Sequence, residues 1–157
     1  MATSGLMLMA RGPVMQSALS KLFETRQIYK RYAAVVDGQM NAQADWQLID
    51  LPIALDWPNR PLQIVSADGK PSQTRWRVLH HNTDTNTTRV ELEPITGRTH
   101  QLRVHLRAIG HPILGDMLYA PVAVQAKAAR LMLHASTLRF VHPASGESMV
   151  FEDAPAF

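Results

Sequence analysis

The most informative segment of the sequence runs from Glu93 to Asp116 and reads EPITGRTHQLRVHLRAIGHPILGD. We predict that it contains a helix beginning near Thr99 and ending at Gly110, because glycine is common just after a helix and Pro112 cannot continue one. Three arginines and three of the chain's seven histidines lie within this stretch. Such a density of hydrogen-bond donors makes the helix the first candidate for a binding or catalytic site.

The predicted helix has two faces at about 100° per residue. The apolar face is expected to pack against a core and consists of Leu102, Leu106 and Ile109. The basic face consists of His100, Arg103 and Arg107. A basic stripe suits phosphates or a buried carboxylate, although a solvated helix face remains the alternative. The turn at 96–99 favours an anion site, because it sets free backbone N–H groups beside cationic side chains.

Composition indicates one globular domain over residues 1–157, with 46% hydrophobic and 18% charged residues. The net charge of +3 fits contact with nucleic acid without requiring it. Cysteine is absent, which excludes disulfides and thiolate metal sites. With no apolar run of membrane length and no visible secretory signal, we expect a cytoplasmic protein without membrane contact.

Hydrophobic periodicity and turn residues predict the remaining elements. Strands are expected at 6–10 (a helix being the alternative there), 29–36, 46–51, 73–79, 88–92, 131–140 and 148–151, and helices at 13–25 and 122–130. We expect the strands at 73–79 and 88–92 to form a hairpin. Segment 55–72 is rich in turn residues, which predicts a loop. Strands outnumber helices and short turns connect them, so the fold class is α+β with a largely antiparallel sheet.

The histidine spacing does not favour a metal site. His80 and His81 point to opposite faces of a strand, and His100 and His105 are not four residues apart as on a zinc-binding helix. His134 is expected to be a hydrogen-bonded core residue. No serine-hydrolase elbow or glycine-rich phosphate loop is present either. Tyr32 lies in a basic cluster with Lys30 and Arg31, where stacking on a base competes with an ordinary sheet position.

Three motifs together resemble the RluA-type RNA pseudouridine synthases. The 94–116 stretch is similar to their C-terminal signature, 29–33 (YKRYA) to their tyrosine strand, and 131–135 (LMLHA) to their closing strand. Segments 56–61 and 69–71 resemble the subgroup nearest RluA itself. The resemblance covers essentially the whole chain.

The resemblance implies a mixed, mainly antiparallel sheet flanked by helices, with a cleft across its middle. It implies isomerisation of specific uridines to pseudouridine in 23S rRNA, tRNA or both, with no cofactor and no metal. Tyr32 and Arg103 would be catalytic, Tyr32 stacking on the flipped base and Arg103 pairing with the catalytic carboxylate. RNA-binding residues would be Lys30, Arg31, Arg60, Arg98, His100 and Arg107.

One departure from the family pattern concerns the nucleophile. In the family an aspartate lies in His-Arg-Leu-Asp-x-x-Thr-Ser-Gly, and residues 1–5 match only the last five positions. We therefore expect an N-terminally truncated catalytic domain with little activity of its own. An internal start codon, a deliberate fragment and a natural fragment all fit. A non-catalytic RNA-binding module is the alternative function. We also expect self-association through an exposed sheet edge near Leu6.

Overall fold

The computed structural model describes residues 3–41 and 45–157, so Met1 and Ala2 of the expected family match lie outside the described residues. The elements are β1 (Ser4–Gly5), α1 (Pro13–Glu24), β2 (Tyr29–Asp37), β3 (Gln47–Asp50), β4 (Ile53–Leu55), β5 (Gln63–Val65), β6 (Gln73–Asn82), β7 (Thr87–Pro94), α2 (Gln101–Ala108), α3 (Val122–Gln125), β8 (Leu133–Val141) and β9 (Ser148–Glu152).

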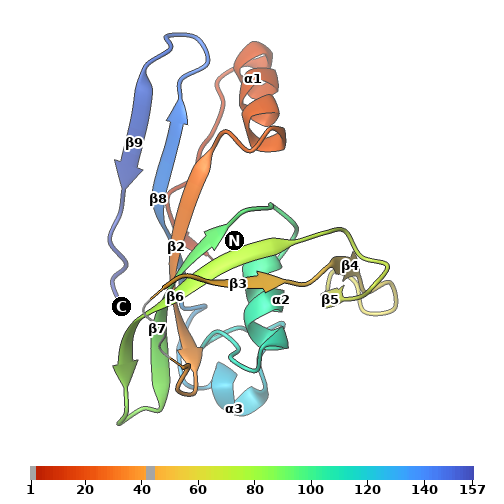
Figure 1. The fold of residues 1–157 in the computed structure, drawn as a ribbon, viewed down its shortest axis with the longest axis vertical. Helices are drawn as coiled ribbons and strands as arrows, with labels where there is room; N and C mark the ends of the chain where they lie inside the picture. The colour runs from red at the N-terminus through yellow and green to blue at the C-terminus, as the bar shows by residue number, and fades with distance from the viewer. Residues whose placement is uncertain (1–2, 42–44) are drawn as a thin grey trace.

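The described strands form a seven-stranded sheet in the order β1-β8-β2-β7-β6-β3, with β9 also paired to β8. β1 runs parallel to β8, and every other described pair in this sheet is antiparallel. The α+β class with a mainly antiparallel sheet is confirmed. Figure 1 shows β8, β9 and α1 extending from one end of the molecule, while α2 lies behind β3 and β6.

The core forms where α2 packs on the middle of the sheet. Leu102 and Leu106 of α2 cluster with Val36 of β2, and with Val90 and Leu92 of β7. All but Leu102 in this group are fully buried. The apolar stripe predicted for the helix is confirmed, and its burial fixes which face of α2 remains for polar contacts. No described helix is long and apolar enough to cross a membrane.

The predicted strand at 6–10 is wrong. β1 ends at Gly5, and only the N–H of Leu6 continues the pairing, by donating to the carbonyl of Ala135. The edge of β8 is taken from Thr137 onward by β9, so no partner is left for residues 6–10. These residues instead run beside a second core, where Leu6 and Leu8 pack near Phe140.

Residues 55–72 are not a plain loop. Ile53–Leu55 and Gln63–Val65 pair as a separate two-stranded sheet that projects from the molecule in Figure 1. Gly69 permits a close approach beside β4, because a Cβ there would lie 2.6 Å from the carbonyl carbon of Ile53. Hydrophobic periodicity did not predict these strands, because the segment is rich in proline and an alternating pattern cannot be recognised over three residues. The helix predicted at 122–130 is likewise shorter, ending at Gln125.

Candidate active site at the N-terminal end of α2

A cavity of about 410 Å³ opens beside the N-terminal end of α2. Strand β2 contributes Lys30 and Tyr32, and β8 contributes Leu133. The remaining wall comes from the end of β7, the turn that follows it, the first residues of α2 and Thr3. The volume is within the range of small-molecule sites. Five of the residues predicted from the sequence meet here, namely Lys30, Tyr32, Arg98, His100 and Arg103.

Tyr32 reaches this cavity from an irregular point of β2. The pairing of β2 with β8 shifts register between Arg31 and Tyr32, and such bulges re-aim a side chain. Its hydroxyl makes no hydrogen bond to any residue in the described part of the chain. Burial raises the pKa of Tyr32 above its ordinary value, so the phenol stays protonated at neutral pH. The site therefore offers the aromatic ring of Tyr32 and a protonated hydroxyl that bonds to no described residue.

Gln101 shapes the turn that forms the cavity wall. Its side-chain oxygen accepts hydrogen bonds from the Thr96 hydroxyl at 2.7 Å and the Arg98 N–H at 3.0 Å. Its amide nitrogen donates to the Gln73 carbonyl at 2.9 Å and the Thr74 hydroxyl at 3.0 Å. Because the side chain is buried and fully bonded, it ties the turn to β6.

Arg103 is held by a buried carboxylate. Its Nε donates to Asp116 Oδ2 at 2.8 Å and its Nη2 to Oδ1 at 2.5 Å, in a two-point contact. Asp116 is fully buried, and its Oδ1 also accepts the N–H groups of Leu118 and Tyr119 at 3.0 and 3.1 Å. A guanidinium clamped on one edge presents a fixed orientation to the cavity.

Tyr119 and His100 complete the ring of contacts around Arg103. The Arg103 guanidinium lies over the Tyr119 ring, 4.9 Å from its centroid. The Tyr119 oxygen accepts the Gln63 N–H at 3.0 Å and lies 2.7 Å from His100 Nδ1. Burial and the neighbouring Arg103 lower the pKa of His100, which favours the neutral imidazole at pH 7. His100 occupies a left-handed conformation at the N-cap of α2.

Two cations at the cavity have no carboxylate partner. Within residues 3–41 and 45–157, neither Lys30 nor Arg98 forms an ion pair. Arg98 donates to the Pro71 carbonyl at 3.3 Å, which leaves its charge uncompensated. Burial lowers the pKa of Lys30. Unpaired cations beside a cavity suit an anionic ligand.

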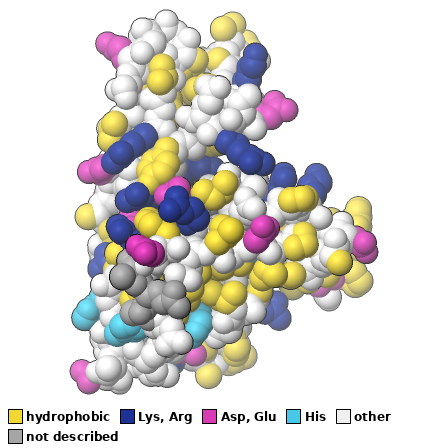
Figure 2. All heavy atoms as spheres, viewed as in Figure 1, with side chains coloured by type: hydrophobic (Ala, Val, Ile, Leu, Met, Phe, Trp, Pro, Cys, Tyr) yellow, Lys and Arg dark blue, Asp and Glu magenta, His cyan; other side chains and the backbone are white. Residues whose placement is uncertain are grey.

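Three residues predicted to bind RNA do not line this cavity. Arg31 lies on the sheet and pairs with Glu91 at 3.1 Å. Figure 2 shows that Lys and Arg side chains and Asp and Glu side chains are mixed in the middle of the face in view. Arg60 stacks on Trp57 at 4.8 Å in the segment joining β4 and β5. Arg107 is exposed on α2, one turn beyond Arg103.

Sequence reasoning missed the supporting residues Gln101, Asp116 and Tyr119. The 94–116 stretch contains the first two, but their positions along the chain do not show which groups they contact. Tyr119 gave no signal, because its role depends on a contact with Gln63, 56 residues away. His134 is confirmed as a hydrogen-bonded core residue, contacting Ser4 Oγ at 3.0 Å.

Comparison with known proteins identifies relatives of this architecture. The family described as RNA pseudouridylate synthase matches residues 1–108. The dual-specificity RNA pseudouridine synthase RluA of Escherichia coli (strain K12) is 49% identical over 157 residues, covering 99% of this chain and 70% of the relative. RluA of Pasteurella multocida (strain Pm70) is 46% identical, covering 100% and 71%.

A solved structure is also similar. Human RNA Pseudouridylate Synthase Domain Containing 1 has a TM-score of 0.78 and 30% identity, covering 93% of this chain and 62% of that chain. The chain therefore spans about two thirds of the length of these relatives, and the resemblance seen in the sequence motifs is confirmed.

Proposed function

The chain belongs to the RNA pseudouridylate synthase family, and we propose that its cavity receives a uridine flipped out of an RNA stem-loop for isomerisation to pseudouridine. One observation carries the proposal: the free hydroxyl of Tyr32 and the clamped guanidinium of Arg103 line the same cavity. The Tyr32 ring offers a stacking face for the base, and the unpaired cations suit the phosphates of the flipped nucleotide.

Isomerisation breaks the N1–C1′ bond of uridine and joins C1′ to C5. N1 gains a proton and C5 loses one, so the reaction needs a group that handles a proton near the base. Tyr32 supplies a protonated hydroxyl that no described residue occupies. Arg103 would orient a carboxylate with the free edge of its guanidinium, since Asp116 occupies the other.

The substrate class is inferred from the relatives, and the charges at the cavity suit it. RluA relatives are named dual-specificity RNA pseudouridine synthases. We infer that this protein acts in the cytoplasm on stem-loops of rRNA, tRNA or both. Arg98 and Lys30 would contact phosphates next to the cavity.

The described lining of the cavity includes no carboxylate, so the nucleophile of the expected mechanism is not supplied there. Thr3 lies in the wall of the cavity. We expect the 157-residue chain to release little tritium from C5-labelled uridine in an anticodon stem-loop or rRNA transcript. Adding the family sequence through His-Arg-Leu-Asp directly before Met1 should restore release.

The test separates the two candidate functions. Restored tritium release that Tyr32→Phe abolishes would support isomerisation. RNA binding that weakens with salt, without release even from the extended protein, would favour the non-catalytic RNA-binding module. The observation that favours the non-catalytic module is that the described lining of the cavity includes no carboxylate. Release by the 157-residue chain at the rate of an extended homologue would contradict the expected need for the aspartate.

Self-association belongs to the proposal as well. Met7 and Met9 are 58% and 79% exposed next to β1, the two-residue strand at the sheet edge. An uncovered edge with apolar neighbours favours pairing with a second copy. We therefore propose that the chain associates through this segment.

A further inference from the structure

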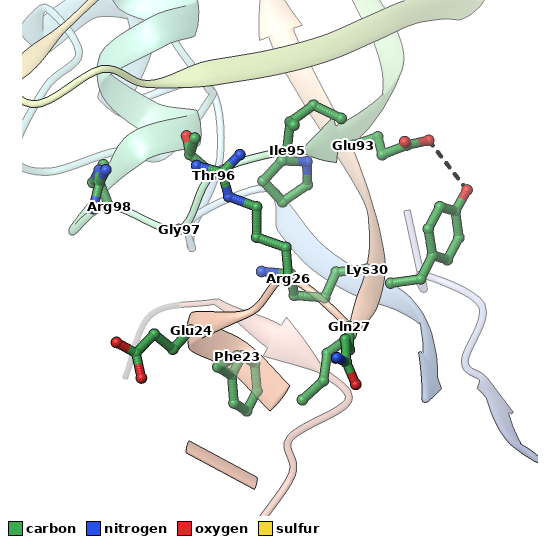
Figure 3. Close-up of a pocket in the computed structure, with 13 residues that line it drawn as sticks. Phe23, Glu24, Arg26, Gln27, Lys30, Glu93, Ile95, Thr96, Gly97 and Arg98 are labelled. Atoms are coloured by element: carbon green, nitrogen blue, oxygen red, sulfur yellow. Dashed lines mark hydrogen bonds between the residues drawn. The ribbon is translucent and has the colours of Figure 1, made fainter. Parts of the chain in front are cut away.

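A second, larger cavity adjoins the candidate active site. It has a volume of about 570 Å³ and lies between the end of α1 and the turn after β7. Figure 3 shows Phe23 on the α1 side of this cavity, with Arg26 extending across it toward the 95–97 segment. Neither the proposed chemistry nor the sequence motifs gives this space a role.

The two cavities share one wall. Lys30, Pro94, Thr96, Gly97 and Arg98 line both of them. A ligand that fills the Tyr32 cavity and continues past this wall therefore enters the second cavity. In an RNA strand, successive nucleotides are joined by a phosphodiester, so the shared wall is where that phosphate would pass.

Gly97 leaves this wall open. Its φ lies outside the left-handed region, so the backbone does not require glycine there. A Cβ would meet only Lys30 Nζ within 4 Å, at 3.8 Å. The Gly97 N–H donates to no described residue. A glycine without a conformational reason, beside an unpaired ammonium, permits a ligand to approach the backbone closely.

The charges in the second cavity favour a phosphate at the shared wall. Among the described residues, Arg26, Lys30 and Arg98 form no ion pair, and Lys30 and Arg98 stand at the shared wall. Glu93 is engaged, since it accepts the Tyr29 hydroxyl at 3.1 Å and lies 3.6 Å from Arg75. Glu24 and Arg26, of opposite charge, lie on the far side near the carbonyl end of α1. The two cations at the shared wall therefore favour a phosphate there.

Phe23 provides an apolar face on that far side. Its side chain is 45% exposed, although it lies in the last turn of an amphipathic helix. The Lys30 ammonium lies 5.7 Å from its ring centroid, so the cation at the shared wall and the aromatic face are near each other. A base whose phosphate lies against Lys30 and Gly97 reaches this ring.

We infer that the second cavity binds the nucleotide next to the flipped uridine, with its linking phosphate on Lys30 and the Gly97 N–H and its base against Phe23. This inference rests on the proposed function, because it assumes that uridine occupies the Tyr32 cavity. The second cavity is then a subsite that binds a neighbouring base, and Lys30 and Gly97 position the RNA strand between the two cavities.

Binding of a fluorescein-labelled anticodon stem-loop RNA, followed by anisotropy at several salt concentrations, tests the inference. Each nucleotide flanking the uridine is replaced in turn by an abasic residue. At one position the abasic RNA and Phe23→Ala should each weaken binding about 5- to 150-fold, and together no more than either alone. Lys30→Gln should lower the steepness of log K against log salt by about 0.7. An RNA with an uncharged methylphosphonate at the adjoining linkage should lower it by the same amount, and the two changes together should lower it no further.

Matched variants serve as controls. Phe151→Ala removes a similarly exposed phenylalanine (39%) from β9, and Lys21→Gln removes a lysine of α1 that lines neither cavity. Both should bind as the unaltered chain does. Gly97→Ala should melt at the unchanged temperature yet weaken binding, because its methyl group occupies the phosphate path.

Two results would overturn the inference. If Phe23→Ala and the abasic substitutions weaken binding independently at every position, no base lies against Phe23. If Lys30→Gln leaves the salt slope unchanged, no phosphate lies at the wall. Should either occur while Tyr32→Ala still weakens binding, the proposed function survives and the subsite fails. A complete lack of RNA binding by the unaltered chain would overturn both.

Discussion

Replacing Asp116 with asparagine tests whether the site depends on the buried ion pair. Asp116 Oδ1 accepts three hydrogen bonds, from Arg103 Nη2 and two backbone N–H groups, and Oδ2 accepts one from Arg103 Nε. Asparagine has one oxygen, which can keep the Oδ1 set. Its amide nitrogen then faces the Nε–H of Arg103, donor against donor, and the negative charge is gone.

The structure indicates the size of the effect. The Asp116 side chain is fully buried and that of Arg103 is 11% exposed, so little solvent screens the loss. Breaking a buried pair costs about 3–5 kcal/mol because the remaining charge is uncompensated. For a chain of this size, each kcal/mol lowers the melting temperature by about 2–4 °C, so Asp116→Asn should melt about 6–20 °C lower.

Thermal unfolding followed by circular dichroism measures the difference, with Asp37→Asn as the control. Asp37 pairs with Lys127 at 2.5 Å, but its side chain is 29% exposed and that of Lys127 36%. An exposed pair contributes about 0–1 kcal/mol, so the control should shift by at most ~4 °C. Similar melting of the two variants would refute the reasoning that Asp116 anchors a buried pair.

The same pair decides how Arg103 is tested. Arg103→Ala would leave Asp116 buried without its partner, so lost activity could reflect lost stability. Arg103→Lys keeps the charge while removing the two-point contact. In the extended protein, we expect this variant to lose isomerisation at temperatures where it remains folded. Normal tritium release by Arg103→Lys would show that a fixed guanidinium is not needed.

Three further predictions follow from the site and the sheet edge. Tyr32→Phe keeps the stacking face, so RNA affinity should stay within about threefold by anisotropy while isomerisation by the extended protein is lost; a large drop in affinity would show that the hydroxyl contacts RNA. Burial lowers the pKa of His105 below its ordinary 6.5, so the unfolded chain takes up the proton more readily and the free energy of unfolding in urea should decrease as pH falls below 6.5. Above pH 6.5 this contribution of His105 to stability should be complete. His105→Gln should flatten the dependence, and an unchanged profile would exclude His105 as its cause. Light scattering at micromolar concentration should show self-association that Met7→Lys with Met9→Lys weakens; a clean 17.5 kDa monomer would contradict it.

Prediction from sequence succeeded where a periodic run was long. The hairpin of β6 and β7, the helix α1 and the strand β2 were all located, because each has at least eight residues over which alternation or helical spacing repeats. It failed at 6–10, where an apolar run was too short to distinguish a strand from an irregular segment beside a core. It also failed at β4 and β5, whose three-residue strands carry no period.

The family, the fold class and several cavity residues could be predicted from the sequence alone. The donors, the turn and the apolar stripe of the 94–116 stretch are local features, set by spacing along one helix. The catalytic roles of Tyr32 and Arg103 followed only from the resemblance of three motifs to the pseudouridine synthases.

Which charges form ion pairs depends on the tertiary structure. Asp116 and Arg103 are 13 residues apart and Tyr119 and Gln63 are 56 apart, and packing alone brings each pair into contact. Arg31 and Lys30 are adjacent in sequence. Arg31 pairs with Glu91 on the sheet, whereas Lys30 lies between two cavities and forms no ion pair with any described residue. Successive residues of a strand point to opposite faces, so their partners depend on which strands and helices cover each face.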